Sequence, residues 1–232
     1  MIVLGLETSS AVCSVGVVWE NGKRVQRSLL EGRVHSEKLL ALVQQALTDG
    51  NVRTADLDAV AVSGGPGSFT GLRIGMSSAK GLSRSLDVPL VVVPTFDGLA
   101  ESVRMAEPGL HLVLIALDAR QGDYYCQLFN VNASRADPAE AARTADKREI
   151  LDRLRNHRPD LLVTDVVGTG GEWGDVRVAD ARPHFRGDVI AALGMIRLTT
   201  GKTADAVDAE PFYLKDFIVR RHGSGSREVP RA

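Results

Sequence analysis

Cysteine, aromatic residues and excess charge are all scarce in this chain of 232 residues. The two cysteines, Cys13 and Cys126, lie in apolar runs, which favours reduced, buried thiols over a disulfide framework or a nucleophile. Aromatic residues make up 5% of the chain, and 28 basic residues against 29 acidic ones leave a net charge of -1. This balance argues against a free-standing RNA-binding module, which uses basic patches and stacked aromatic side chains.

Long apolar runs and a secretory leader are also missing. No run approaches the roughly 18 consecutive apolar residues of a membrane-spanning helix, and no charged segment precedes an apolar one at the N-terminus. We therefore expect a cytoplasmic protein that makes no contact with a membrane.

The pattern that remains predicts an α/β protein that opens with an antiparallel hairpin. Asn21-Gly22 is a typical two-residue hairpin turn between apolar runs. Alternation and helical periodicity distinguish the elements that follow. Strands are predicted over residues 2–6, 11–19, 25–30, 57–62 and 90–93, and helices over residues 36–48, 72–86 and 94–105.

A second, looser series of the same kind begins at Gly109. It contains predicted strands over 110–117, 124–131 and 161–167 and predicted helices over 137–155 and 189–198. In both halves a strand, an acidic turn and another strand recur, which indicates an ancient duplication. We expect two lobes with mixed β-sheets flanked by helices, an N-terminal lobe of residues 1–106 and a smaller C-terminal lobe of residues 107–222. Residues 223–232 lack apolar content and are expected to be a disordered tail.

The most informative motif is the glycine-rich turn between the strand at 57–62 and the helix at 72–86. Ser68 or Thr70 is a suitable N-cap, and such a turn directs free N–H groups toward an anion or a carbonyl oxygen. The turn is not a standard nucleotide loop, because no lysine follows Gly71 and its glycines are too widely spaced for a dinucleotide fingerprint. A tight turn before a closely packed helix is an equal alternative.

Several short motifs occur in order along almost the whole chain. They are LGLETSS at 4–10, CSV at 13–15, HSE at 35–37, GPGSFTGLRIG at 65–75, AKGL at 79–82, DAR at 118–120 and PFYL at 211–214. In these motifs the chain resembles the bacterial TsaB (YeaZ) family of the actin-like ATPase superfamily. The glycine-rich motif is the most specific of them. The resemblance implies two actin-like, RNase H-like lobes.

The resemblance also implies a function. TsaB proteins are non-catalytic partners of TsaD, which transfers a threonylcarbamoyl group to adenosine next to the anticodon of tRNAs and so forms N6-threonylcarbamoyladenosine (t6A). The implied partners are TsaD, the small ATPase TsaE, and a second copy of the chain when TsaD is absent. Contact with tRNA is implied only through the complex. No tightly bound cofactor is implied, although ATP or ADP at the interface with TsaD remains open.

The nucleotide-binding turns of this superfamily are altered here. The first turn carries Glu7, where aspartate is more usual, followed by Thr8 and Ser9, and the second carries Asp118 and Arg120. Residues 168–171 are a candidate adenosine loop. Glu7 could still hold magnesium through water. An actin-like ATPase or phosphotransferase with its own nucleotide site is therefore the alternative function.

No metal site is expected, because the histidines are scattered and no two of them lie three to five residues apart. The interleaved charges of residues 143–158 are typical of a solvated helix face. The basic residues near the C-terminus, from Lys215 onward, are a candidate contact to tRNA phosphates in the complex.

Two predicted helices carry the expected partner surface. Gly71, Gly75 and Ala79 recur every four residues, which lets another helix approach closely, and the apolar arc of each helix is wide. Packing of the same stripes against the chain's own sheet is the alternative. The expected partner-binding residues are Leu39, Leu40, Val43, Gly71, Leu72, Gly75, Met76 and Ala79. The adjoining loop residues are Gly65, Pro66, Gly67, Ser68, Phe69, Thr70 and Arg73.

Overall fold

The computed structural model describes residues 1–30, 35–166 and 171–215 of the chain. Residues 216–222, the predicted tail at 223–232 and residues 168–170 of the predicted adenosine loop lie outside these ranges. Within them, none of the helices combines the length and the apolar character that a membrane span requires.

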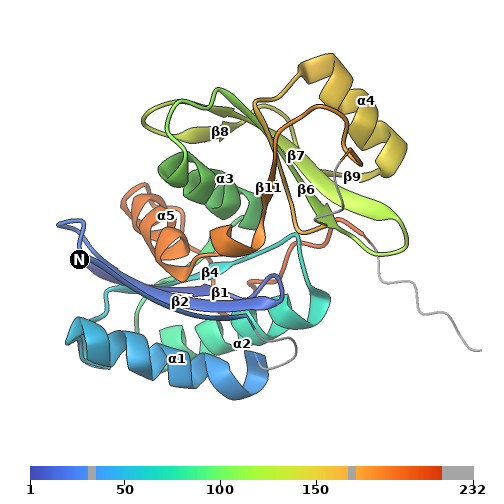
Figure 1. Cartoon of the computed structure of the whole chain (residues 1–232). Helices are drawn as coiled ribbons and strands as arrows, with labels where there is room; N and C mark the ends of the chain where they lie inside the picture. The colour runs from blue at the N-terminus through green and yellow to red at the C-terminus, as the bar shows by residue number, and fades with distance from the viewer. Residues whose placement is uncertain (31–34, 167–170, 216–232) are drawn as a thin grey trace, which may run out of the picture.

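Two β-sheets with the same internal plan form the framework (Figure 1). The first has the order β3-β2-β1-β4-β5, and the second has the order β11-β10-β6-β7-β8, with β9 also paired to β7. In each sheet the first strand pairs antiparallel with the second and parallel with a later one, β1 with β2 and β4, and β6 with β7 and β10. This repetition confirms the prediction of an α/β protein with two mixed sheets.

The bounds of the strands follow the apolar runs closely, except for the short strands β8, β9 and β11. The first sheet contains β1 Ile2–Glu7, β2 Val12–Trp19, β3 Arg24–Leu30, β4 Ala59–Ser63 and β5 Leu90–Val93. The second contains β6 Leu112–Asp118, β7 Asp123–Val131, β8 Ala136–Pro138, β9 Arg143–Asp146, β10 Leu161–Thr164 and β11 Val178–Asp180. The helices are α1 His35–Gly50, α2 Phe69–Leu86, α3 Thr95–Ala106, α4 Lys147–His157 and α5 Gly187–Thr199, with short 3-10 turns η1 Thr54–Asp56 and η2 Arg182–His184.

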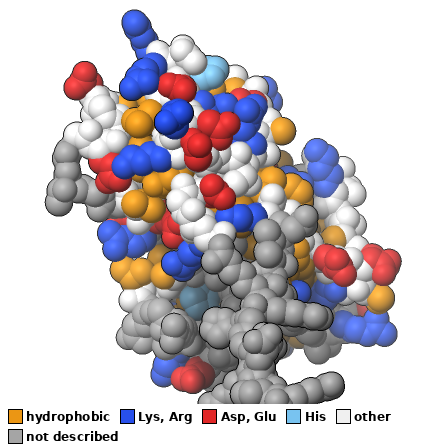
Figure 2. All heavy atoms as spheres, turned by 90° about the vertical axis from the view of Figure 1, so that its right-hand side faces the viewer, with side chains coloured by type: hydrophobic (Ala, Val, Ile, Leu, Met, Phe, Trp, Pro, Cys, Tyr) orange, Lys and Arg blue, Asp and Glu red, His pale blue; other side chains and the backbone are white. Residues whose placement is uncertain are grey.

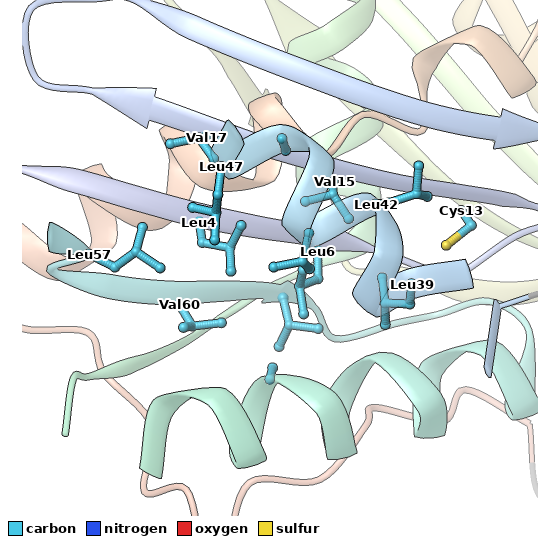
Figure 3. Packing of buried hydrophobic residues seen from close by; sticks show 14 of the residues in the cluster. Leu4, Leu6, Cys13, Val15, Val17, Leu39, Leu42, Leu47, Leu57 and Val60 are labelled. Carbon is cyan, nitrogen blue, oxygen red and sulfur yellow. The ribbon is translucent and has the colours of Figure 1, made fainter. Parts of the chain in front are cut away.

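The helices and sheets stack in alternating layers. Helices α1 and α2 cover one face of the first sheet, α5 and α3 lie between the two sheets, and α4 covers the outer face of the second sheet (Figure 1). Because side chains alternate along a strand, Leu4 and Leu6 pack toward α1 and α2, whereas Val3 packs with α5. Figure 3 shows the first of these cores, with Leu39 and Leu42 of α1 against Leu6 and Val15 of the sheet.

The division at residue 106 separates the strands of the two sheets but not the helices. Helix α5 follows the second sheet in sequence and yet packs on β1, β2 and β4 of the first. Two glycines allow this approach, since a Cβ at Gly5 would lie 2.1 Å from the carbonyl oxygen of Gly187, and one at Gly16 would lie 2.1 Å from the backbone nitrogen of Asp188. Helix α5 of the C-terminal part of the chain therefore covers the first sheet.

The predicted helix over 137–155 is wrong in its first half. Residues of β8 and β9 pair antiparallel with β7 instead, and the helix begins only at Lys147. Asp146 is the N-cap, because its side chain accepts a hydrogen bond from the backbone N–H of Glu149 while the Glu149 side chain accepts one from Asp146. This reciprocal capping box marks the true start of the helix. Figure 2 shows acidic and basic side chains intermixed over the upper part of the molecule.

Candidate functional site

A cleft of about 910 Å³ lies between the two lobes, where the corresponding turns of both sheets meet. One wall consists of the turn after β1, the glycine-rich loop and the first residues of α1 and α2. The other wall consists of the turn after β6, Asp165 and Lys215, while Tyr213 lines the cleft from the side of α2. The cleft therefore unites the two turns that the sequence predicted as a pair.

Glu7 does not line this cleft, although it belongs to the first predicted turn. Its side chain is 2% exposed, and its Oε1 accepts hydrogen bonds from the Ser9 N–H at 2.7 Å, the Ser9 Oγ at 2.6 Å and the Ser63 Oγ at 3.1 Å. Burial raises the pKa of Glu7, partly offset by these bonds. The carboxyl group is thus engaged inside the fold, and Ser9 stands between it and the cleft wall.

Thr8 connects the first turn to α2. It is fully buried, and a Cβ at Gly71 would lie 2.0 Å from its carbonyl oxygen. A Cβ at Gly75 would lie 2.1 Å from its Oγ1. The small residues of α2 therefore allow close packing against the chain's own first turn.

The glycine-rich loop is a junction of four chain segments. The Ser68 N–H donates to the Ser9 carbonyl at 2.6 Å, the Gly65 N–H donates to Thr95 Oγ1 at 3.1 Å, and the Gly64 carbonyl accepts from the Phe212 N–H at 2.7 Å. Gly65 has φ +108, a conformation that side chains rarely adopt. Pro66 is buried beside it, and Gly67 lines the cleft. Of the two interpretations of the glycine-rich motif, the tight turn before a closely packed helix describes the contacts of this loop.

Ser68 caps the helix that follows, since its Oγ accepts from the Gly71 N–H at 3.3 Å. Two other predicted loop residues, Phe69 and Arg73, form a cluster with Tyr213. The Arg73 guanidinium lies 3.9 Å from the Phe69 ring centroid, and its Nε donates to Tyr213 Oη at 3.2 Å. The Phe69 and Tyr213 rings are 5.2 Å apart, while Thr70 is exposed at the cleft edge.

Most of the predicted partner-binding residues are buried within the chain itself. Leu40 is 59% exposed, whereas the others are buried against the first sheet or the first turn: Leu39, Val43, Gly71, Leu72, Gly75, Met76 and Ala79. The alternative of packing against the chain's own sheet is correct for these residues, because one apolar stripe on each helix supplies the first core (Figure 3). The outward faces carry Leu40, Ala41 and Gln44 on α1, and Ser77 and Gly81 on α2.

The second turn is held by carboxylates. Asp118 Oδ1 accepts from the Arg120 N–H at 2.8 Å, and Asp165 Oδ1 accepts from the Asp118 N–H at 2.8 Å. The Arg120 side chain is 88% exposed and pairs with Asp118 at 3.5 Å. Burial raises the pKa of Asp165. Sequence reasoning missed Asp165, yet the signal was present: it follows β10, a strand parallel to β6, so both strands end at the same edge of the sheet.

Within the described ranges, no three His, Cys, Asp or Glu side chains are placed to hold a metal ion together. Both cysteines are free and buried, as expected. Burial raises the pKa of Cys13 to about 11 and raises that of Cys126, so neither thiol is activated as a nucleophile.

Comparisons with known proteins agree with this geometry. The family model described as "TsaD: tRNA N6-adenosine threonylcarbamoyltransferase" matches residues 30–161. The chain is 31% identical over 226 residues to "tRNA threonylcarbamoyladenosine biosynthesis protein TsaB" of Escherichia coli K12, covering 94% of this chain and 96% of that protein. It is 29% identical over 227 residues to the Bacillus subtilis protein of the same name, covering 93% and 94%.

Among solved structures, YeaZ from Pseudomonas aeruginosa superposes with a TM-score of 0.77 at 25% identity, covering 92% of this chain and 99% of that one. The similarity thus extends over more than nine-tenths of the chain. The extent of the sequence similarity and the shared fold show that the chain belongs to the TsaB (YeaZ) family of actin-like proteins.

Proposed function

We propose that this chain supports the formation of t6A in tRNA as the non-catalytic partner of TsaD. The observation that carries the proposal is the similarity over 94% of the chain to a protein named for t6A biosynthesis. The match to the TsaD family model adds that the chain and its partner share a fold. A protein of tRNA modification works where tRNA is found, which supports a cytoplasmic location.

The burial of Glu7 supports a role without catalysis. A carboxylate that holds magnesium beside a nucleotide presents its oxygens to the cleft. Here the Glu7 Oε1 already accepts three hydrogen bonds from Ser9 and Ser63. The hydroxyl groups of Ser68 and Thr70 at the cleft are suited to phosphate oxygens, so ATP or ADP fits best as a ligand shared with TsaD.

The outward face of α1 and α2 is the proposed docking surface for TsaD. A Cβ at Gly81 would meet no atom within 4 Å, so this part of α2 is open to a partner. Gly81 and Ser77 are small and Leu40 is an exposed apolar side chain, a combination that lets helices approach closely and gain apolar burial. A stable interface of this kind buries more than about 1,000 Å².

The other proposed partners follow from the same surface. A second copy of the chain would dock there when TsaD is absent, so that the homodimer and the heterodimer compete. TsaE joins the assembled complex, and tRNA binds only to that complex.

Reconstitution tests the role in t6A formation. Purified TsaD, TsaE, threonylcarbamoyl-adenylate and tRNA are incubated with and without this chain, and t6A is quantified in digested tRNA. We expect t6A only when both TsaD and this chain are present. Formation of t6A by this chain without TsaD, or steady phosphate release by this chain alone from Mg-ATP, would show instead that it is an enzyme.

A substitution at Gly81 tests the docking surface. Gly81→Leu places a large side chain on the outward face and, by replacing a helical glycine, leaves the isolated chain at least as stable. We expect its affinity for TsaD to fall at least about tenfold, a loss of about 1.4 kcal/mol. Gly81→Ala is the matched control, because it gives the same helical gain with little bulk. Equal affinities of the two variants for TsaD would exclude this surface.

A further inference from the structure

The C-terminal strap, residues 204–215, runs along the first lobe after α5. Ala204 forms an antiparallel bridge with Leu90 at the outer edge of β5, and its N–H donates to the Leu90 carbonyl at 2.9 Å. Further on, Lys80 of α2 donates to the Val207 carbonyl at 3.0 Å, and Ala206 and Ala209 pack against the first core. The first part of the strap, from Ala204 to Ala209, is therefore bound to the first lobe.

At the glycine-rich loop this binding becomes tighter. The Phe212 N–H donates to the Gly64 carbonyl, and a Cβ at Gly65 would lie 2.3 Å from the Phe212 carbonyl oxygen. Tyr213 then adds its contacts with Phe69 and Arg73 of α2. A glycine is required at position 65 because the strap lies directly on the loop.

The next two residues bond to the opposite lobe. Thr144 Oγ1 of β9 donates to the Leu214 carbonyl at 3.5 Å. Lys215 Nζ donates to Asp123 Oδ2 at 2.7 Å and to the Arg120 carbonyl at 3.3 Å. Figure 1 shows this last red stretch entering beside the turn that joins β6 and β7. Consecutive residues thus hold both walls of the cleft, and Tyr213 and Lys215 are themselves part of its lining.

We propose that residues 212–215 are a latch that holds the two lobes together across the cleft and so controls access to it. The lobes are joined in their interior by α3, whose Phe96 and Leu99 pack in the core of the second sheet and which also contacts α5, and by Val12 of β2 in the same core. In this proposal the latch opposes rotation of one lobe on the other at the cleft, where these interior contacts do not reach.

The latch is attached more strongly to the first lobe than to the second. The attachment to the first lobe uses backbone hydrogen bonds, a ring contact and close packing, whereas the attachment to the second lobe depends mainly on the Lys215–Asp123 ion pair. Its side chains are 25% and 35% exposed, and ion pairs of this exposure contribute little net free energy and are screened by salt. The latched and unlatched states are therefore close in free energy, and a ligand that prefers one of them shifts their populations.

Spin-label distance measurements on the full chain test the latch. Cysteines introduced at the exposed residues Gln45 and Ala141 place one label on each lobe, while the native Cys13 and Cys126 are buried and do not compete. We expect Lys215→Met to shift the distance distribution to longer values and to broaden it. Raising the salt concentration to about 0.5 M should also shift the distance distribution of the chain with an unsubstituted Lys215 to longer values, because salt screens the ion pair.

Two comparisons make the result decisive. Lys202→Met removes another exposed lysine ahead of the strap and should leave the distribution unchanged. The exchange Lys215→Asp with Asp123→Lys reverses the pair and should restore the short distances. The proposal is overturned if Lys215→Met behaves like Lys202→Met, or if the exchanged pair stays as open as Lys215→Met. The measurement needs no TsaD, so its failure would leave the proposed function untouched.

Discussion

Substitution of Gly75 by alanine tests how closely α2 approaches the first turn. The new Cβ would lie 2.1 Å from Oγ1, 3.3 Å from Cβ and 3.5 Å from Cγ2 of Thr8. Thr8 is fully buried and β-branched, so its side chain has little freedom to move aside. The methyl group must therefore displace the turn or the helix.

The magnitude follows from a comparison with Gly81 on the same helix, where a Cβ meets nothing within 4 Å. Alanine gains up to about 1 kcal/mol over glycine within a helix at either position. Overpacking at Gly75 costs about 1–3 kcal/mol, so the free energies of unfolding of the two variants should differ by about that amount. In a chain of this size, each 1 kcal/mol shifts the Tm by about 2–4 °C.

Urea denaturation of both variants measures this difference, and a double-mutant cycle identifies its cause. Thr8→Ala removes Oγ1 and Cγ2, so in that background Gly75→Ala should lose most of its cost. If Gly75→Ala and Gly81→Ala are equally stable, or if Thr8→Ala does not change the effect of Gly75→Ala, the proposed contact is incorrect.

Two further predictions concern buried carboxyl groups. Because burial raises the pKa of Glu7 above its ordinary 4.5, the stability that protonated Glu7 contributes is complete below that pH and is lost as the pH rises through the raised pKa. Glu7→Gln should therefore gain stability relative to the unsubstituted chain as the pH rises above 4.5, and a difference in the free energy of unfolding by urea that does not change with pH would contradict this. Asp188 is fully buried and pairs with Arg186 at 2.9 Å and Arg24 at 3.4 Å. Asp188→Asn should cost about 3 kcal/mol, at the low end for buried pairs because both arginines are partly exposed, and an unchanged Tm would refute that assignment.

The periodicity of apolar residues predicted the sheets and most helices because those patterns are local. The pairing of the two acidic turns followed from their recurrence in both halves. The orientation of the helices could not be read in the same way. Gly71, Gly75 and Ala79 suit a partner helix and the chain's own Thr8 equally well, and only the position of the first turn decides between them.

Two other features depend on segments far apart in sequence. The destination of α5 is set by Gly5 and Gly16, which precede it by more than half the chain. The bond between the Phe212 N–H and the Gly64 carbonyl likewise joins residues that no local pattern connects. The start of α4 was also predicted wrongly, although a local signal was present, since Asp146 and Glu149 form a recognisable capping pair.

The placement of α5 has a consequence for biosynthesis. A ribosome delivers the strands of the first sheet early, but the helix that shields their inner side, with Ile190 and Ala191, is among the last elements to emerge. Until then Val3, Ala61 and Val91 have no cover, and the nascent N-terminal half presents an apolar surface to chaperones. A polypeptide that stops before residue 187 should therefore be recovered as aggregate rather than as an independent half-molecule.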